Sequence, residues 1–281
     1  MNPTIWRLVV GLALSALIGL VAYRKQALSG SGVIGAIVTG SCIFGFGGWV
    51  WGLTLVAFFV YGTLLSRFKE RQKAKVAAEK FEKGSRRDLG QALANGGVGA
   101  VLAVLFFLSP DSDWLFAGFV GAMATVNADT WATEIGVLSR AAPRLITTGR
   151  KVPPGTSGGV TALGTLATLL GGFAIGLTVW ALLFGKSWLQ PATDWAGFWW
   201  ALPVGAIAGL AGSLADSLLG ATVQAMYTQA HTGQATEKKF DHQDRPNPFR
   251  RGWPFMNNDA VNFSSSVIGA AAASALYLLL V

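Results

Sequence analysis

The chain has 281 residues, of which 52% are hydrophobic and only 13% are charged. Because soluble domains carry about 25% charged residues, this composition excludes a soluble globular protein and predicts an all-α polytopic membrane protein in a lipid bilayer. The net charge of +8 does not indicate a nucleic-acid polymer as partner, since cytoplasmic loops of membrane proteins collect Lys and Arg. The 36 Gly and 11 Trp residues fit close helix packing in lipid and interfacial anchoring.

Apolar runs recur along the chain, and we expect about eight transmembrane helices in a single membrane domain over residues 1–281. The first run is followed by Arg24 and Lys25 rather than preceded by positive charge, which predicts a retained helix with its N-terminus outside. Residues 33–66 are too long for one span, and 45–49 predict a tight turn, although a re-entrant pair or one long tilted helix stays open. The expected spans are 5–23, 33–47, 49–66, 89–109, 114–138, 160–184, 196–221 and 261–281.

Positive charge is concentrated in alternate loops of this arrangement. These loops are residues 24–32, 67–88, 139–159 and 222–260. Together they contain 20 of the 22 Lys and Arg residues. The positive-inside rule therefore places them in the cytoplasm and both termini outside. The segment 67–88 has the spacing of a solvated helix, or it forms a basic rim for phosphate with Arg86 and Arg87 nearest the membrane.

Polar side chains gather toward the cytoplasmic ends of four different spans. An ionised carboxylate in the bilayer core costs about 2.5–3.5 kcal/mol even on the scale derived from membrane insertion, which gives the lowest values. Acids at this depth therefore indicate a structural or functional role. The group comprises Asn95, Asn127, Asp129, Glu134, Asp216, Asn257, Asn258, Asp259 and Asn262. Their common depth predicts a polar cavity at the cytoplasmic face, with a network that only locks helices together as the alternative.

The segment 127–136 carries two of these carboxylates on one expected helix. At about 100° per residue, Asn127, Thr130 and Glu134 share a face, whereas Asp129 lies about 140° from Glu134. The two carboxylates therefore bind different partners, or the helix is irregular at a depth where irregular backbone is tolerated only beside a cavity.

Small residues recur every three or four positions around the acid of the seventh span, a pattern typical of a close helix–helix interface. The stripe comprises Gly205, Gly209, Ser213, Asp216 and Gly220. An acid in this stripe faces other helices and must be paired, protonated or bound to a metal. The tripeptide 215–217 is similar to 128–130, which leaves an ancestral repeat open.

Carboxylate and amide oxygens suit Mg²⁺, which takes one or two protein carboxylates plus phosphates and waters. Asp129, Asp216 and Asp259 are the natural ligand set in this sequence. A glycine-rich turn at 155–159 follows Arg150 and Lys151 and precedes an expected helix. Such a turn caps the helix or presents backbone N–H groups to an anion, and its place between acid-bearing helices favours phosphate.

Five segments, in order, resemble the integral membrane family known as domain of unknown function 92. They are residues 91–97, 127–136, 153–160, 212–224 and 257–262. The resemblance runs from about residue 30 to the C-terminus. The family includes phytyl-phosphate kinases of vitamin E (tocopherol) biosynthesis and is similar to CTP-dependent polyprenol kinases.

The resemblance implies phosphoryl transfer from a nucleoside triphosphate, with CTP favoured and ATP as the alternative, to a prenyl monophosphate such as phytyl phosphate. With Mg²⁺ as cofactor, Asp129, Asp216 and Asp259 would hold the metal, and Glu134 would bind a second metal or orient the acceptor. The catalytic set is then Asp129, Glu134, Asp216, Asp259 and Lys151. Nucleotide and phosphate contacts are expected from Arg87, Asn95, Asn127, Thr130, Gly155, Thr156, Ser157, Gly158, Gly159, Ser217, Gln224, Asn258 and Asn262.

An ion- or proton-coupled transporter that uses the buried acids is the main alternative. A transport path needs access from both sides, whereas the ionisable groups cluster toward one side, and this favours an enzyme. A lipid cytidylyltransferase or alcohol phosphotransferase would share the metal and the donor but break a different bond. A purely structural membrane protein would need none of these groups.

Overall fold

The computed structural model describes residues 3–70, 72–73, 86–191, 196–229, 233–241, 243 and 245–281. Most of the middle of the charged segment 67–88 therefore lies outside the described residues. Within the described part, eight helical segments have the length of a membrane span. They are α1 (Pro3–Arg24), α2 (Gly30–Cys42) with the π-helix η1 (Ile43–Gly47), α3 (Trp49–Arg67), α5 (Leu89–Leu108), α6 (Asp113–Gly136), α7 (Ala162–Leu189), α8 (Ala201–Thr222) and α9 (Asn258–Leu280).

Seven of these segments are also apolar enough to cross a bilayer, judged over the described residues by length and composition. The exception is α6, which carries Asn127, Asp129, Thr130 and Glu134 on its second half. The prediction of an all-α polytopic membrane protein is confirmed, with α6 as an eighth helix of spanning length.

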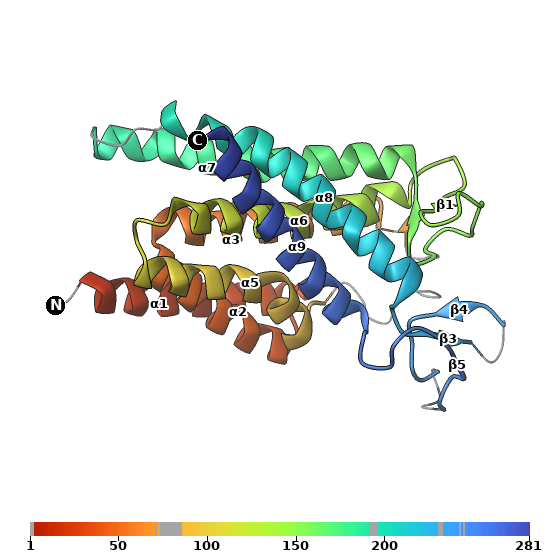
Figure 1. Cartoon of the computed structure of the whole chain (residues 1–281). Helices are drawn as coiled ribbons and strands as arrows, with labels where there is room; N and C mark the ends of the chain where they lie inside the picture. The colour runs from red at the N-terminus through yellow and green to blue at the C-terminus, as the bar shows by residue number, and fades with distance from the viewer. Residues whose placement is uncertain are drawn as a thin grey trace.

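The helices lie side by side in one elongated bundle with loops at its two ends (Figure 1). Both chain termini lie at one end, and the short strands β1 and β3–β5 lie at the opposite end (Figure 1). This second end, called the strand end below, contains the loops after α6 and α8, two of the segments in which the sequence concentrates positive charge.

Helix α6 lies at the centre of the bundle, where α3, α5, α7, α8 and α9 pack around it. Its residues 115–128 are buried without a break. A helix buried on every side has no lipid-facing stripe, so its polar residues must contact other helices. The bundle is therefore built around the helix that carries Asp129 and Glu134.

The predicted turn near residue 48 separates α2 with η1 from α3. Gly48 adopts φ = 85°, a left-handed conformation that glycine takes readily. Its backbone N–H donates to the Phe44 carbonyl over 2.8 Å. The sequence predicted two helices here, but the π-helical last turn of the first one, Ile43–Gly47, was not expected.

The predicted small-residue stripe of α8 packs against α7 and α6. A methyl group added at Gly209 would lie 2.8 Å from the Cα atom of Gly172 on α7, closer than real packing permits. The same is true of Gly205 against the carbonyl oxygen of Gly172, at 2.8 Å. Glycine thus allows close backbone approach between these helices, as expected in lipid, and orients Asp216 toward the interior.

The strand-end loops contain short strands that were expected only as irregular loops. β1 (Arg144–Leu145) pairs with β2 (Gly159–Val160), and β3 (Met226–Thr228) lies between β4 (Ala235–Thr236) and β5 (Phe249–Arg251). Arg251 of β5 donates to the carbonyl of Gly220 over 3.0 Å and to that of Thr222 over 3.3 Å. These bonds satisfy carbonyls at the C-terminal end of α8 and fix the sheet to the bundle.

Candidate active site

A cavity of about 620 Å³ lies at the strand end, lined by residues of α3, α5, α6, α7, α8 and α9 and of the loops between them. All but three of the predicted site residues line it. They are Arg87, Asn95, Asp129, Thr130, Glu134, Gly155, Thr156, Ser157, Gly158, Gly159, Asp216, Ser217, Gln224, Asn258 and Asn262. Segments separated by more than a hundred residues in sequence therefore meet around one space.

Asn127, Lys151 and Asp259 are not among the residues that line this cavity. Asn127 is fully buried and donates from Nδ2 to the Gly171 carbonyl over 2.7 Å, so it joins α6 to α7. Lys151 is exposed in the loop before β2. Asp259 lies in the first turn of α9, two residues after the capping residue Asn257.

Asp129 of α6 and Asp216 of α8, called the acid pair below, lie close enough to interact electrostatically. Ser213 hydrogen-bonds to Asp129, and the Ser265 hydroxyl of α9 donates to Oδ2 of Asp216 over 3.1 Å. Since neighbouring carboxylates repel each other, a cation beside them would stabilise the pair.

The donor set of the acid pair fits Mg²⁺, which needs only one or two protein carboxylates when phosphates and waters complete its shell. The predicted set of three acids does not form a common group. Across the described residues, no cluster of three or more His, Cys, Asp or Glu side chains could hold a metal ion. Among the described residues, Asp129 and Asp216 are the carboxylates that could hold such an ion, and Glu237, which also lines the cavity, lies within electrostatic reach of Asp216.

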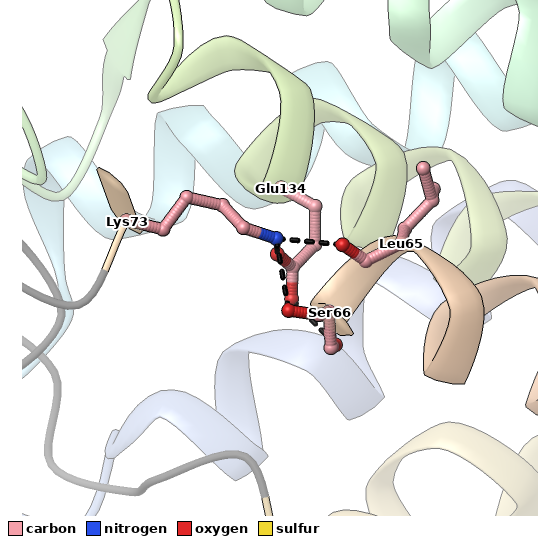
Figure 2. Close-up of polar contacts among 4 residues, drawn as sticks. All are labelled: Leu65, Ser66, Lys73 and Glu134. Atoms are coloured by element: carbon pink, nitrogen blue, oxygen red, sulfur yellow. Dashed lines mark hydrogen bonds and ion pairs between the residues drawn. The ribbon is translucent and has the colours of Figure 1, made fainter. Parts of the chain in front are cut away.

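Glu134, one and a half turns further along α6, has entirely different partners (Figure 2). Its carboxylate forms an ion pair with Lys73 and accepts a hydrogen bond from the Ser66 hydroxyl over 2.6 Å. Lys73 also donates to the carbonyls of Leu65, over 2.6 Å, and Ser66, over 3.1 Å. Both carboxylate oxygens are occupied by side chains of this chain, which leaves little capacity for a second metal.

The helix α6 is continuous through Gly136. Of the two alternatives that the sequence left open, the structure thus shows a regular helix whose two carboxylates have different partners. Asp129 faces α8, and Glu134 faces the end of α3 and Lys73.

Arg87 extends from the loop before α5 across α3. Its Cζ atom lies 5.5 Å from the ring centroid of Phe58 and 5.6 Å from that of Phe59, and its Nη2 atom contacts Gly62. Burial lowers the pKa of the Arg87 guanidinium, and the negative charge of Glu134 opposes this effect. We call Lys73, Arg87 and Glu134 the cation cluster, because Lys73 pairs with the Glu134 carboxylate and Arg87 lies within electrostatic reach of it.

The glycine-rich turn 155–159 packs on the C-terminal end of α8. Gly155 and Gly158 have φ values of 73° and 81°, and a methyl group at Gly158 would collide with Ala221. Ser157 donates to Oε1 of Gln224, whose Nε2 donates to Glu237 over 3.0 Å. The backbone N–H groups of Thr156 and Gly159 bond within the loop, so the turn is held in place by both its backbone and α8.

Three helices begin at the cavity, and each has a side-chain cap. Asp88 caps α5 in a capping box with Gln91, Thr161 caps α7, and Asn257 caps α9. Helix N-termini carry partial positive charge and attract anions. The cavity thus combines carboxylates, which attract cations, with cationic groups and helix N-termini, which attract anions.

Several lining residues were missed by the sequence interpretation. They are Ser66, Glu70, Lys73, Thr161, Thr165, Thr168, Ser213, Glu237 and Lys238. Ser213 belongs to the small-residue stripe and could have been proposed from its spacing to Asp216. Lys73 lies in a run of charges in which no spacing distinguishes it from its solvated neighbours.

Fold and site together define a polytopic membrane protein with a polar, charged cavity at one end of its helix bundle. The chain belongs to the family described as integral membrane protein DUF92, whose model matches residues 13–270. The predicted family resemblance is confirmed.

Relatives occur in plants and archaea. Protein PGR of Arabidopsis thaliana is 38% identical over 233 residues, which cover 78% of this chain and 80% of that protein. An uncharacterized membrane protein of Methanocaldococcus jannaschii is 31% identical over 275 residues, covering 98% and 96%. Protein VTE6, chloroplastic, of Arabidopsis thaliana is 36% identical over 150 residues, covering 52% of this chain and 45% of that protein. No solved structure matches the chain.

Proposed function

We propose that this protein is a membrane phosphotransferase that phosphorylates a prenyl monophosphate, in the first place phytyl phosphate, with CTP as donor and ATP as the second choice. The likeness of its five motifs to phytyl-phosphate kinases suggests the substrate class. The observation that carries the proposal is the cavity in which the acid pair lies opposite two cations and three helix N-termini.

In the proposed reaction, a phosphate oxygen of the prenyl monophosphate attacks the γ-phosphorus of the nucleotide. The bond between that phosphorus and the β–γ bridging oxygen breaks, and a nucleoside diphosphate leaves with the bond's electrons. The acceptor is already an anion near neutral pH, so the transfer needs no strong general base.

The main difficulty of this transfer is repulsion between two phosphate groups, which positioning and charge neutralisation overcome. Asp129 and Asp216 would hold Mg²⁺, which when bound neutralises the triphosphate. Ser213 and Ser265 orient the two carboxylates. Asn95, Asn258 and Asn262, at the starts of α5 and α9, supply amide groups to phosphate oxygens.

The glycine-rich turn and Gln224 form the wall of the cavity toward the strand-end loops, where a soluble nucleotide would enter. The positive-inside rule assigns this end to the cytoplasm, so donor and lipid acceptor would meet at the cytoplasmic face. The prenyl chain would extend along the bundle into the bilayer.

The experiment that tests the proposal is a donor and acceptor panel with the purified protein in lipid nanodiscs. We expect phytyl phosphate with Mg²⁺ and CTP to yield phytyl diphosphate and CDP. Release of pyrophosphate or CMP instead would indicate a cytidylyltransferase or alcohol phosphotransferase. Ion flux into liposomes that Asp216→Asn abolishes, without any phosphorylated product, would indicate a transporter.

A further inference from the structure

Five charged side chains that line the cavity, those of the acid pair and of the cation cluster, are divided between two places. The acid pair lies between α6 and α8 and is connected through Ser213 and Ser265 to α8 and α9. The cation cluster lies on the other side of α6, where Glu134 faces α3 and Lys73. A single central helix therefore presents one carboxylate to each place.

Among the described residues, the cation cluster has two positive charges and one negative charge, since Lys73 forms an ion pair with Glu134 and Arg87 lies within electrostatic reach of the same carboxylate. Lys73 is only 7% exposed and is held by two backbone carbonyls in addition to Glu134. Glu70, the other acid of this region that lines the cavity, is exposed, where solvent screens its charge. A buried excess charge is unfavourable unless a counterion approaches, so an anion that enters here is stabilised.

The cluster also adjoins a helix that exposes apolar side chains, α3. Arg87 stacks on Phe58 and Phe59 of α3 and contacts Gly62. On the outer surface of α3, Val60 is 43% exposed and Leu64 is 63% exposed, at the same level along the helix. An amphiphile whose headgroup binds Arg87 can therefore keep its apolar chain beside α3 in the bilayer.

We infer that the cation cluster is the subsite for the phosphate headgroup of the acceptor lipid, and that the metal-bound donor occupies the acid pair. The identity of the acceptor as a prenyl monophosphate rests on the proposed function. Two phosphates that must react repel each other, so each needs its own positive partner. Without a metal the acid pair repels a monophosphate, whereas Lys73 and Arg87 attract it.

Glu134 is a positioning residue in this subsite. It accepts hydrogen bonds from Lys73 and Ser66 and lies within electrostatic reach of Arg87, so it keeps both cations beside the cavity. Its role is to order the two cations, and it touches neither reacting phosphate.

Binding without turnover tests the inference directly. The purified full chain, in Mg²⁺-free buffer without nucleotide, is titrated with a ten-carbon prenyl monophosphate and with the corresponding prenyl alcohol. We expect Lys73→Gln and Arg87→Gln each to weaken monophosphate binding by about tenfold or more, the scale of one charge-assisted hydrogen bond. Lys73→Arg, which keeps the charge, should retain most of the affinity, and binding of the alcohol should not change.

Matched variants distinguish local effects from general ones. Lys69→Gln removes the same charge four residues away, where Lys69 is exposed and outside the cavity lining, and should bind like wild type. Gly62→Ala places a methyl group against the guanidinium of Arg87, whereas Gly185→Ala, also helical, meets nothing within 4 Å. We expect the first glycine variant to weaken binding and the second to leave it intact.

Wild-type affinity in both Lys73→Gln and Arg87→Gln would overturn the inference, as would equal affinity of the wild type for the monophosphate and the alcohol. In turnover assays, Lys73→Gln should raise KM for the acceptor and leave KM for the donor unchanged. The reverse pattern would place the donor at the cation cluster. Lys73-dependent binding of the monophosphate by a protein that transfers no phosphate would refute the kinase proposal and support the subsite.

Discussion

At the scale of single residues, the site depends on which neighbour each acid has. Asp129 and Asp216 have each other and two serines, whereas Glu134 has a lysine and an arginine. Two carboxylates of one helix thus have different environments, beside a second carboxylate on one side of α6 and beside cations on the other.

At position 158, both the backbone conformation and the neighbouring helix require glycine. In Gly158→Ala, the alanine must adopt a left-handed conformation, which costs about 1–2 kcal/mol for a non-glycine residue. Its methyl group would also collide with Ala221. Gly149→Ala has the same kind of strain at φ = 67° but meets nothing within 4 Å. We therefore expect a larger fall in melting temperature and turnover for Gly158→Ala than for Gly149→Ala, and equal effects would contradict the docking of this turn on α8.

The sequence identified site residues correctly where burial of the side chain in a membrane carries a high free-energy cost. An acid in an apolar run is expensive, so Asp129, Glu134 and Asp216 were evident, and all three line the cavity. Lys73 was not evident, because a lysine in a charged segment is ordinarily solvated, and only the tertiary structure brings it beside Glu134. The Asn127 side chain has the chemical groups of a phosphate or metal ligand, but its amide donates to the Gly171 carbonyl.

At the scale of elements, close packing of α7 on α8 determines where Asp216 lies. A methyl group at Gly172 of α7 would contact the carbonyl oxygen of Gly205 on α8. Because the methyl group would be fixed to the backbone of α7 and the carbonyl belongs to the backbone of α8, only movement of a helix could relieve this clash. The small-residue spacing of α8 was readable in the sequence, whereas the identity of its partner helix was not.

We predict that Gly172→Ala destabilises the protein by roughly 1–3 kcal/mol, the usual cost of overpacking. Displacement of α8 should also lower turnover, because Asp216 moves relative to Asp129. Thermal unfolding in detergent measures the first effect, with Gly185→Ala on the same helix as control. Unchanged stability of Gly172→Ala would show that α7 and α8 are not in close contact in the membrane.

The limits of boundary prediction at this scale have physical causes. Hydropathy placed the spans within a few residues, since each must be apolar over about 20 residues. It gave no indication of the π-helical turn η1 or of the two small sheets in the strand-end loops. Strands of two or three residues have too few positions to show an alternating pattern.

At the scale of the whole molecule, charge asymmetry and cavity position point to the same face. The described parts of the loops after α6 and α8, which are rich in Lys and Arg, lie at the strand end, and several of their residues line the cavity. A site at one end of the bundle suits an enzyme that joins a soluble donor to a lipid acceptor.

The orientation of the bundle is testable with single cysteines in a Cys42→Ala background, since Cys42 is the one cysteine of the sequence. Lys151→Cys lies in the loop before β2 at the strand end, and Lys186→Cys lies in the last turn of α7 at the other end. We expect a membrane-impermeant maleimide to label the former only in inverted vesicles and the latter only in intact cells. The opposite labelling pattern would place the cavity outside the cytoplasm.

The central claim is that the acid pair serves phosphoryl transfer to a prenyl monophosphate. The most direct measurement follows label from γ-³²P-CTP into phytyl phosphate, with Mg²⁺, for the wild type, Asp129→Asn and Asp216→Asn in nanodiscs. We predict labelled phytyl diphosphate from the wild type and a rate at least about a hundredfold lower in each variant, the scale of losing one preorganised electrostatic partner. Wild-type rates in both folded variants would contradict the account.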